Sequence, residues 1–228
     1  MTDVIAHRGA SSARPENTIE AFVAARSLGA DGVELDVRRT RDGAAVVHHD
    51  AVLADGRPIC GLALAQVPLE VPRLAEALEA CSGMTVNVEI KNVPSDDDFD
   101  PEQLLAHQVV STVERAGLSG QVIVSSFGFA AIDRVRELAP GLRTAWLVTD
   151  RGEAAPLIER AAAAGHLGIH PRWPMVDDTF MELARAAGLF VNAWTVNDPE
   201  TIRRLADLGA DGVVTDVPDI ALAALGRG

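Results

Sequence analysis

Short apolar runs rich in valine and isoleucine alternate along the chain with longer stretches rich in alanine, leucine, glutamate and arginine. The short runs have the length and β-branched content of buried strands, and the longer stretches have the spacing of amphipathic helices. Regular alternation of the two is typical of a parallel α/β fold. The predicted strands are 4–7, 33–38, 85–91, 122–127, 144–148, 167–170, 190–196 and 212–215, and the predicted helices are 18–28, 74–80, 101–116, 129–138, 154–164, 178–187, 199–208 and 220–225.

Eight strand–helix units in a chain of 228 residues predict a (β/α)8 barrel of the TIM type, forming a single domain over residues 1–228. A doubly wound open sheet is the alternative, but no G-x-G-x-x-G sequence follows the first strand. Asp42-Gly43 predicts a hairpin turn from the second strand to an added strand over 44–49. The irregular stretch 51–72 then predicts a short, loop-like cap segment, and the acidic run 96–98 predicts a solvated loop.

Charge and hydropathy narrow the classes of function. The chain carries 33 acidic and 20 basic residues, a net charge of −13, and nucleic-acid binding normally requires a basic surface. It contains no polybasic run for anionic lipids, no signal-peptide pattern and no apolar run near the roughly 20 residues that span a bilayer. Cys60 and Cys81 have no metal-site spacing. We expect a cytoplasmic protein that binds neither nucleic acid nor membranes stably.

Acidic side chains gather at two neighbouring predicted strands, where barrels of this type carry their chemistry. Glu34 and Asp36 occupy alternate positions of one strand and therefore project from the same face, and Glu89 lies on the next strand. Carboxylates that face each other inside a barrel repel unless a cation compensates them. Oxygen ligands suit one hard divalent cation, Mg²⁺ or Ca²⁺, with Mn²⁺ as a further candidate. In the competing interpretation these acids face solvent or pair with Arg38 and Arg39.

Two histidines at strand ends are the candidates for proton transfer. His7 and His49 fit this role because imidazole exchanges its proton near neutral pH, whereas His48 should face the opposite side. Arg8 and Lys91, the only lysine of the chain, lie beside them and could hold a phosphate group. The other histidines have no comparable neighbours, and we interpret them as structural: His107, His166 and His170.

The motifs around these residues follow one another in a defined order. They are His7-Arg8-Gly9-Ala10, Arg14-Pro15-Glu16-Asn17-Thr18, Gly32-Val33-Glu34-Leu35-Asp36-Val37, Val46-Val47-His48-His49-Asp50, Val88-Glu89-Ile90-Lys91, Val124-Ser125-Ser126-Phe127, Asn192-Ala193-Trp194-Thr195-Val196-Asn197-Asp198 and Asp211-Gly212-Val213-Val214-Thr215-Asp216. In this order, and over essentially the whole chain, they resemble the glycerophosphodiester phosphodiesterase family.

The resemblance implies a TIM-type barrel that hydrolyses glycerophosphodiesters to glycerol 3-phosphate and an alcohol. It implies a cation site, a general acid and a general base, a phosphate clamp, and an apolar wall against the glycerol carbons. By this resemblance, Glu34, Asp36 and Glu89 would bind the cation, and His7 and His49 would be the general acid and base, without an assignment of which is which. Arg8 and Lys91 would hold the phosphate, Phe127 and Trp194 would form the apolar wall, and Glu16 would line the site.

The chain departs from the family pattern after Asp50, where Ala51 stands in place of the usual proline and the capping insertion is short. Two other interpretations therefore stay beside the first. The same site could act on lysophospholipids as a lysophospholipase D, or the barrel could bind a phosphate ligand without turnover. Attack by water and attack by the substrate's own hydroxyl are both consistent with the residues. The expected partner is a small-molecule glycerophosphodiester, and a homo-oligomer stays open.

Overall fold

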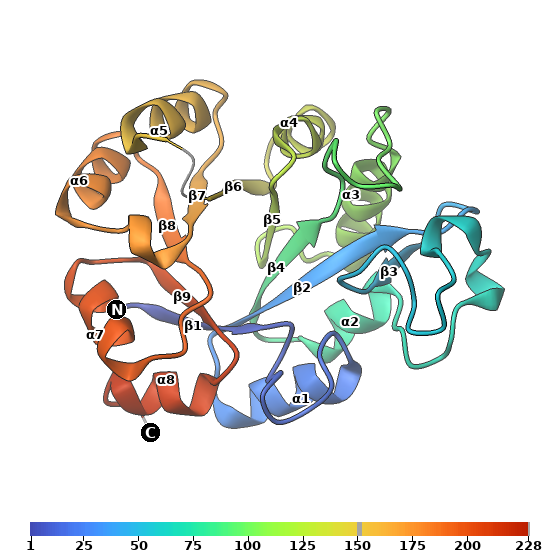
Figure 1. The fold of residues 1–228 in the computed structure, drawn as a ribbon, viewed down its shortest axis with the longest axis horizontal. Coiled ribbons are helices and arrows are strands. Elements are labelled where there is room, and N and C mark those ends of the chain that lie inside the picture. Colours follow the sequence, from blue (N-terminus) through green and yellow to red (C-terminus); the bar gives the residue numbers. More distant parts are fainter. Residues whose placement is uncertain (150–151, 228) are drawn as a thin grey trace.

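The computed structural model describes residues 1–149 and 152–227. Eight parallel strands close into a barrel, with the helices around its outside (Figure 1). The barrel is closed because β1 pairs with β9 on one side and with β2 on the other. This confirms the (β/α)8 prediction and excludes the open doubly wound sheet. The parallel strands are β1 (Asp3–His7), β2 (Gly32–Arg39), β4 (Thr85–Ile90), β5 (Val122–Ser126), β6 (Arg143–Val148), β7 (Gly168–Pro171), β8 (Phe190–Ala193) and β9 (Gly212–Thr215).

The α-helices of the described chain connect these strands and close the outer layer. They are α1 (Ile19–Leu28), α2 (Leu74–Ala80), α3 (Leu104–Ala116), α4 (Phe129–Leu138), α5 (Ala154–Ala163), α6 (Asp178–Ala186), α7 (Pro199–Asp207) and α8 (Pro218–Ala224). Side-chain oxygens of Thr18, Asp177 and Asp198 accept backbone N–H groups at the starts of α1, α6 and α7. Such caps satisfy donors that have no partner within the helix.

Among the predicted boundaries that differ from the observed ones, three have clear local reasons. Helix α3 begins at Leu104 and not at 101, because Gln103 before it adopts a left-handed φ of 55°. Strand β8 ends at Ala193, because Trp194 makes only an isolated bridge with Arg172 beyond that point. Helix α8 begins at Pro218, since proline has no backbone N–H to leave unpaired at a helix start.

The predicted hairpin and cap follow β2. Strand β3 (Ala45–Val47) pairs antiparallel with β2 on the outside of the barrel, after a turn at Gly43 with φ of 87°. The segment 51–72 is irregular but not a bare loop, because it contains two short 3-10 helices, Ile59–Gly61 and Leu64–Gln66. It packs around a small core of its own, formed by Val46, Leu53, Ile59, Leu62 and Val67.

Two large hydrophobic clusters lie between the strands and the helices. The first joins β1, β2, β4 and β5 to α1, α2, α3 and α4, and the second joins β6 to β9 with α5 to α8. In β2 the residues that enter the first cluster are Val33, Leu35 and Val37, all fully buried. Because side chains alternate along a strand, Glu34 and Asp36 must face the barrel interior. No helix among the described residues is both long and apolar enough to cross a membrane.

Candidate active site

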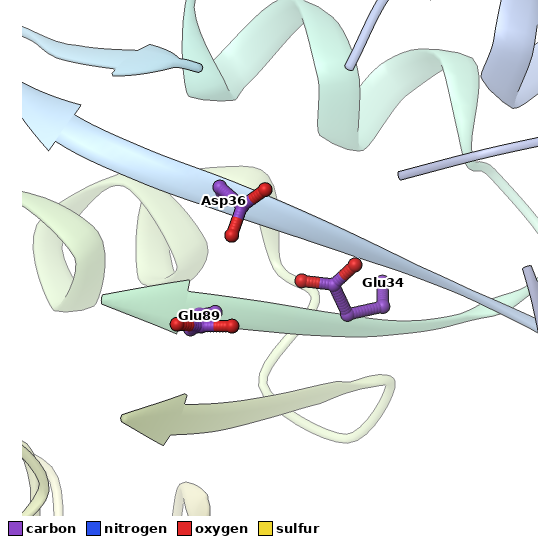
Figure 2. A group of neighbouring side chains, drawn as sticks. All are labelled: Glu34, Asp36 and Glu89. Atoms are coloured by element: carbon purple, nitrogen blue, oxygen red, sulfur yellow. The ribbon is translucent and has the colours of Figure 1, made fainter. Parts of the chain in front are cut away.

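Three carboxylates meet inside the barrel, where the structure brings the predicted metal ligands together. Glu34 and Asp36 lie on β2, and Glu89 lies on β4 directly beside Asp36 in the strand register (Figure 2). One oxygen from each residue lies within 4.8 Å of the others, and all three residues are buried. The cluster is acidic, offers only oxygen atoms as ligands and is largely shielded from bulk water.

The electrostatics of the cluster fit a divalent cation. Burial and the neighbouring Asp36 raise the pKa of Glu34 to about 8, and burial raises the pKa of Glu89. The Glu34 Oε1 atom is buried and has no hydrogen-bond partner. Buried polar atoms are normally satisfied, and adjacent carboxylates ionise together only when positive charge compensates them. The donor set, the charge and the unpartnered oxygen therefore all suit a cation such as Mg²⁺ or Ca²⁺.

Asp36 behaves differently because two cations flank it. Lys91 Nζ lies 3.1 Å from Asp36 Oδ1 and 2.7 Å from Glu89 Oε1, and Arg8 Nε lies 3.2 Å from Asp36 Oδ2. Burial opposes the ionisation of Asp36, but Lys91 and Arg8 outweigh it and lower the pKa of this carboxyl. The amide of Asn17 adds a hydrogen bond of 2.8 Å to Asp36 Oδ2. The flanking cations therefore favour the ionised form of Asp36.

Arg38 and Arg39 do not pair with the acidic cluster, so the competing interpretation is wrong. Arg38 Nη1 donates to both carboxylate oxygens of Asp98 at 2.9 Å, and Arg39 Nε lies 3.6 Å from Asp100 Oδ2. The Asp98 side chain is 7% exposed, which also corrects the prediction of a solvated loop at this residue. Arg38 Nε donates to the backbone carbonyl of His49 at 2.8 Å. This pairing joins the β4–α3 loop to the residue predicted for proton transfer.

The turn after β1 places His7 and Arg8 against the acidic cluster. Arg8 adopts a left-handed φ of 55°, and its backbone N–H donates to Glu34 Oε2 at 3.0 Å. Gly9 follows with φ of 82°, and a Cβ there would lie 2.6 Å from the Cβ of Ala21 in α1. Glycine is therefore required for the turn to pass this close to the helix.

A hydrogen-bonded acid orients His7. Its Nδ1 lies 2.6 Å from Asp216 Oδ1, and its Nε2 faces Glu34 Oε2 at 3.9 Å. Hydrogen bonds from His7, and also from Asn197 and Ser11, lower the pKa of Asp216 to about 2. An ionised Asp216 accepts the Nδ1 hydrogen and leaves Nε2 directed at the cluster. Burial opposes a charge on His7, but Asp216 and Glu34 together raise its pKa.

His49 lies across the same space, after β3. Its Nδ1 lies 2.8 Å from Asp50 Oδ1, so Asp50 fixes this ring as Asp216 fixes that of His7. Burial, followed by the charge of Lys91, lowers the pKa of His49. His48 Nδ1 instead lies 2.9 Å from the Asp50 carbonyl, and His48 does not line the central cavity.

A cavity of about 130 Å³ joins these groups at the carboxyl ends of the strands. Phe127 and Trp194 form one wall. Their rings pack edge to face, with the ring centroids 5.4 Å apart. Trp194 Nε1 donates to the carbonyl of His170 at 2.7 Å, which holds the indole in place. Glu16 lies at the margin, 53% exposed, and accepts a hydrogen bond from Arg8 Nη1 at 2.9 Å. The residues that line the cavity are His7, Arg8, Glu34, His49, Asn87, Glu89, Lys91, Phe127, Leu147, His170, Trp194, Thr195 and Val214.

Three residues near the cavity had no functional role assigned from the sequence. Asn17 and Asp216 occur within the motifs, but only the fold reveals that they hold Asp36 and His7. His170, interpreted as structural, lies in the cavity wall, and burial lowers its pKa to about 3. Its Nε2 lies 3.2 Å from the amide nitrogen of Asn192. Its position at the end of the predicted strand 167–170 was the available signal.

Comparison with known proteins identifies the family. The family model for the glycerophosphoryl diester phosphodiesterase family matches residues 7–220. A glycerophosphodiester phosphodiesterase of Caldanaerobacter subterraneus subsp. tengcongensis is 30% identical over 247 residues, covering 100% of this chain and 99% of the relative. A phosphodiesterase of Oleispira antarctica, solved in complex with the product sn-glycerol-3-phosphate, is 28% identical with a TM-score of 0.88, covering 99% of this chain and 97% of that one. A Thermotoga maritima glycerophosphodiester phosphodiesterase is 28% identical with a TM-score of 0.83, covering 100% and 99%. The chain therefore belongs to the glycerophosphoryl diester phosphodiesterase family and is a phosphoric diester hydrolase.

Proposed function

We propose that this chain hydrolyses glycerophosphodiesters to glycerol 3-phosphate and an alcohol at the cavity described above. The observation that carries the proposal is the grouping of a carboxylate cluster, two oriented histidines and two cations around one small cavity. The sn-glycerol-3-phosphate bound in the Oleispira antarctica relative supports the same product. Family membership supports the reaction class, and the positions of the side chains are consistent with the roles proposed below.

Glu34, Asp36 and Glu89 would hold one divalent cation, Mg²⁺ or Ca²⁺, with Mn²⁺ as a further candidate. Such an ion, when bound, withdraws charge from the phosphoryl oxygens and relieves the repulsion among the three carboxylates. The amide of Asn17 and the backbone N–H of Arg8 hold two of these ligands in place. Supporting hydrogen bonds of this kind fix the direction of ligand oxygens.

Arg8 and Lys91 bind the phosphate of the substrate. Both line the cavity, and both carry positive charge beside the cluster. The guanidinium offers a planar pair of N–H donors, and the ammonium offers a compact charge with three donors. Glu16 holds the Arg8 guanidinium from the outer side. Phe127 and Trp194 would contact the carbon atoms of the glycerol and exclude water from that side.

His7 and His49 carry out the two proton transfers through Nε2, because Nδ1 of each ring is engaged by Asp216 and Asp50. One histidine takes the proton of the attacking hydroxyl as the new P–O bond forms. The other gives a proton to the departing alcohol oxygen as its P–O bond breaks. If the attacking hydroxyl is that of water, the products form in one step. If it is a hydroxyl of the substrate's own glycerol, the alcohol departs as a cyclic phosphate forms, and water opens this ring to glycerol 3-phosphate in a second step. Both routes use the same pair of histidines.

The test is release of glycerol 3-phosphate from glycerophosphocholine by purified protein. Activity should require Mg²⁺, Ca²⁺ or Mn²⁺ and disappear with EDTA, and His49→Ala should lower kcat by at least about 10²-fold. His107→Ala on α3 is the matched control, because His107 contacts Arg134 and does not line the cavity. Full activity in EDTA would reject the cation site. Binding without turnover would leave a phosphate-binding barrel, and turnover of lysophosphatidylcholine alone would identify a lysophospholipase D.

A further inference from the structure

A second cavity, of about 230 Å³, adjoins the first. The two cavities share His49, Glu89, Lys91 and Phe127 in their linings, so they meet at the histidine and lysine of the reaction centre. A diester has two arms on one phosphorus atom. If the phosphate and its glycerol occupy the first cavity, the second is placed to receive the other arm, which is the alcohol that departs.

Two cationic side chains and two carboxylates line the second cavity, and Asp98, which lies behind Arg38, adds a third carboxylate. Lys91 is paired with Glu89 at 2.7 Å. Arg38 directs Nη1 to both oxygens of Asp98 at 2.9 Å and Nε to the carbonyl of His49 at 2.8 Å. Asp96 lies farther away, with Oδ2 at 3.5 Å from Arg38 Nη1. The Arg38 guanidinium therefore faces two carboxylates, those of Asp98 and Asp96. Asp96 is held more weakly, and it is the one that lines the cavity.

The rest of the lining suits a small cationic alcohol. Phe127, Ile90 and Val93 provide apolar surface beside Asp96. An aromatic face and a carboxylate together attract ammonium groups, whether primary or methylated, because the ring quadrupole adds to the ionic attraction. The Asp96 side chain is 24% exposed, so it is accessible from solvent and yet partly shielded from it.

We propose that the second cavity binds the departing alcohol and that Asp96 selects alcohols carrying an ammonium group, as ethanolamine and choline do. This inference rests on the proposed glycerophosphodiester hydrolysis and adds to it the chemistry of the head group. The segment 51–72 does not line this cavity, so head-group selection falls to the β4–α3 loop. Arg38 acts here as a positioning residue, because it holds the loop through Asp98 and the reaction centre through His49.

The experiment measures kcat/KM for glycerophosphoethanolamine, glycerophosphocholine and the neutral glycerophosphoglycerol through release of glycerol 3-phosphate. Asp96→Asn keeps an oxygen acceptor and removes only the charge. It should lower kcat/KM for the two cationic substrates by about fivefold to tenfold and leave the neutral substrate within about twofold. Asp97→Asn is the matched control: it removes the same charge from the same loop at an exposed residue that does not line the cavity, and all three values should stay within about twofold.

Salt provides a second measurement on the wild-type enzyme. Raising NaCl to about 0.5 M should reduce the preference for the cationic substrates, since ions screen a partly exposed charge. An equal loss on all three substrates in Asp96→Asn would give this residue a purely structural role and overturn the inference. No change on any substrate would overturn it as well. If the wild type hydrolyses none of the three, the proposed function itself fails, and the two failures are thereby distinguished.

Discussion

The two halves of the barrel differ in the kind of side chain that they bring to the central cavity. The ionisable residues at its charged wall come from β1 to β4 and the turns that follow them, whereas the residues contributed by β5 to β9 are uncharged. The hydrophobic core is divided along nearly the same line, with one cluster under each half. The half formed by β1 to β4 therefore supplies charged groups to the cavity. The half formed by β5 to β9 supplies apolar surface and neutral hydrogen-bonding groups.

The difference has a consequence for stability. The charged half buries three carboxylates side by side and leaves Glu34 Oε1 without a partner, which opposes folding when no cation compensates it. The neutral half packs aromatic and aliphatic groups that need no such compensation. Binding of a cation should therefore stabilise the first half chiefly, and substrate recognition should depend on the second.

The largest effect is expected when the charged half loses a ligand. Glu34→Gln keeps the side-chain shape and removes the charge, and kcat/KM should fall by about 10³-fold because charge stabilisation of several kcal/mol is lost. The same variant should lose the rise in thermal midpoint that Mg²⁺, Ca²⁺ or Mn²⁺ gives to the wild type, since an ion that binds only the folded state stabilises it. Without added cation the variant should be at least as stable as the wild type, because glutamine avoids the cost of keeping a carboxyl of pKa about 8 protonated at neutral pH.

Glu79→Gln is the control for that variant, because Glu79 lies exposed on the outer helix α2. It changes the net charge equally and should alter neither the cation-dependent midpoint nor kcat/KM. If Glu34→Gln still gains the full midpoint shift with cation, the cluster does not hold the ion. The charged half would then differ from the neutral half in its charge, but it would not be the half that binds the cation.

A smaller effect is expected when the neutral half loses part of its wall. Trp194→Leu removes the indole that packs edge to face on Phe127 and bonds to His170. KM should rise by about tenfold with kcat changed much less, because removal of binding made equally in ground and transition states leaves the chemical step intact. The measurement is steady-state kinetics on glycerophosphocholine. Trp173→Leu, at a surface indole that does not line the cavity, is the control; a fall in kcat alone for Trp194→Leu would contradict the division of roles.

Much of this comparison was available from the sequence. The alternation of strand and helix patterns predicted the barrel, and the i, i+2 spacing of Glu34 and Asp36 predicted two inward carboxylates beside Glu89. Both predictions rest on local periodicity, which a closed parallel barrel obeys on every strand. The positions of His7, Arg8 and Lys91 followed from the same logic of strand ends.

The contacts between distant segments were not available from the sequence. Asp216 lies 209 residues after His7, and the pairing of Arg38 with Asp98 spans 60 residues. Side-chain pairs of this kind depend on how β9 and the β4–α3 loop pack against the first strands. No periodic pattern in the sequence specifies this packing. His170 was interpreted as structural because it has no comparable neighbours in the sequence, and its contact with Asn192 of β8 is visible only in the fold.

The smallest effect concerns this histidine, the one ionisable group in the neutral part of the cavity wall. Burial lowers the pKa of His170 to about 3 from an ordinary 6.5. The unfolded chain thus takes up a proton below about pH 6.5 that the folded chain does not, and the free energy of unfolding should fall by about 1.4 kcal/mol for each pH unit below that point. His170→Asn removes this contribution, so the stability difference between wild type and variant should shrink at that rate between about pH 6.5 and pH 5. Urea unfolding across this range measures it. Parallel curves for the two proteins would mean that His170 takes up its proton in the folded state, and the second half of the cavity would then carry charge like the first.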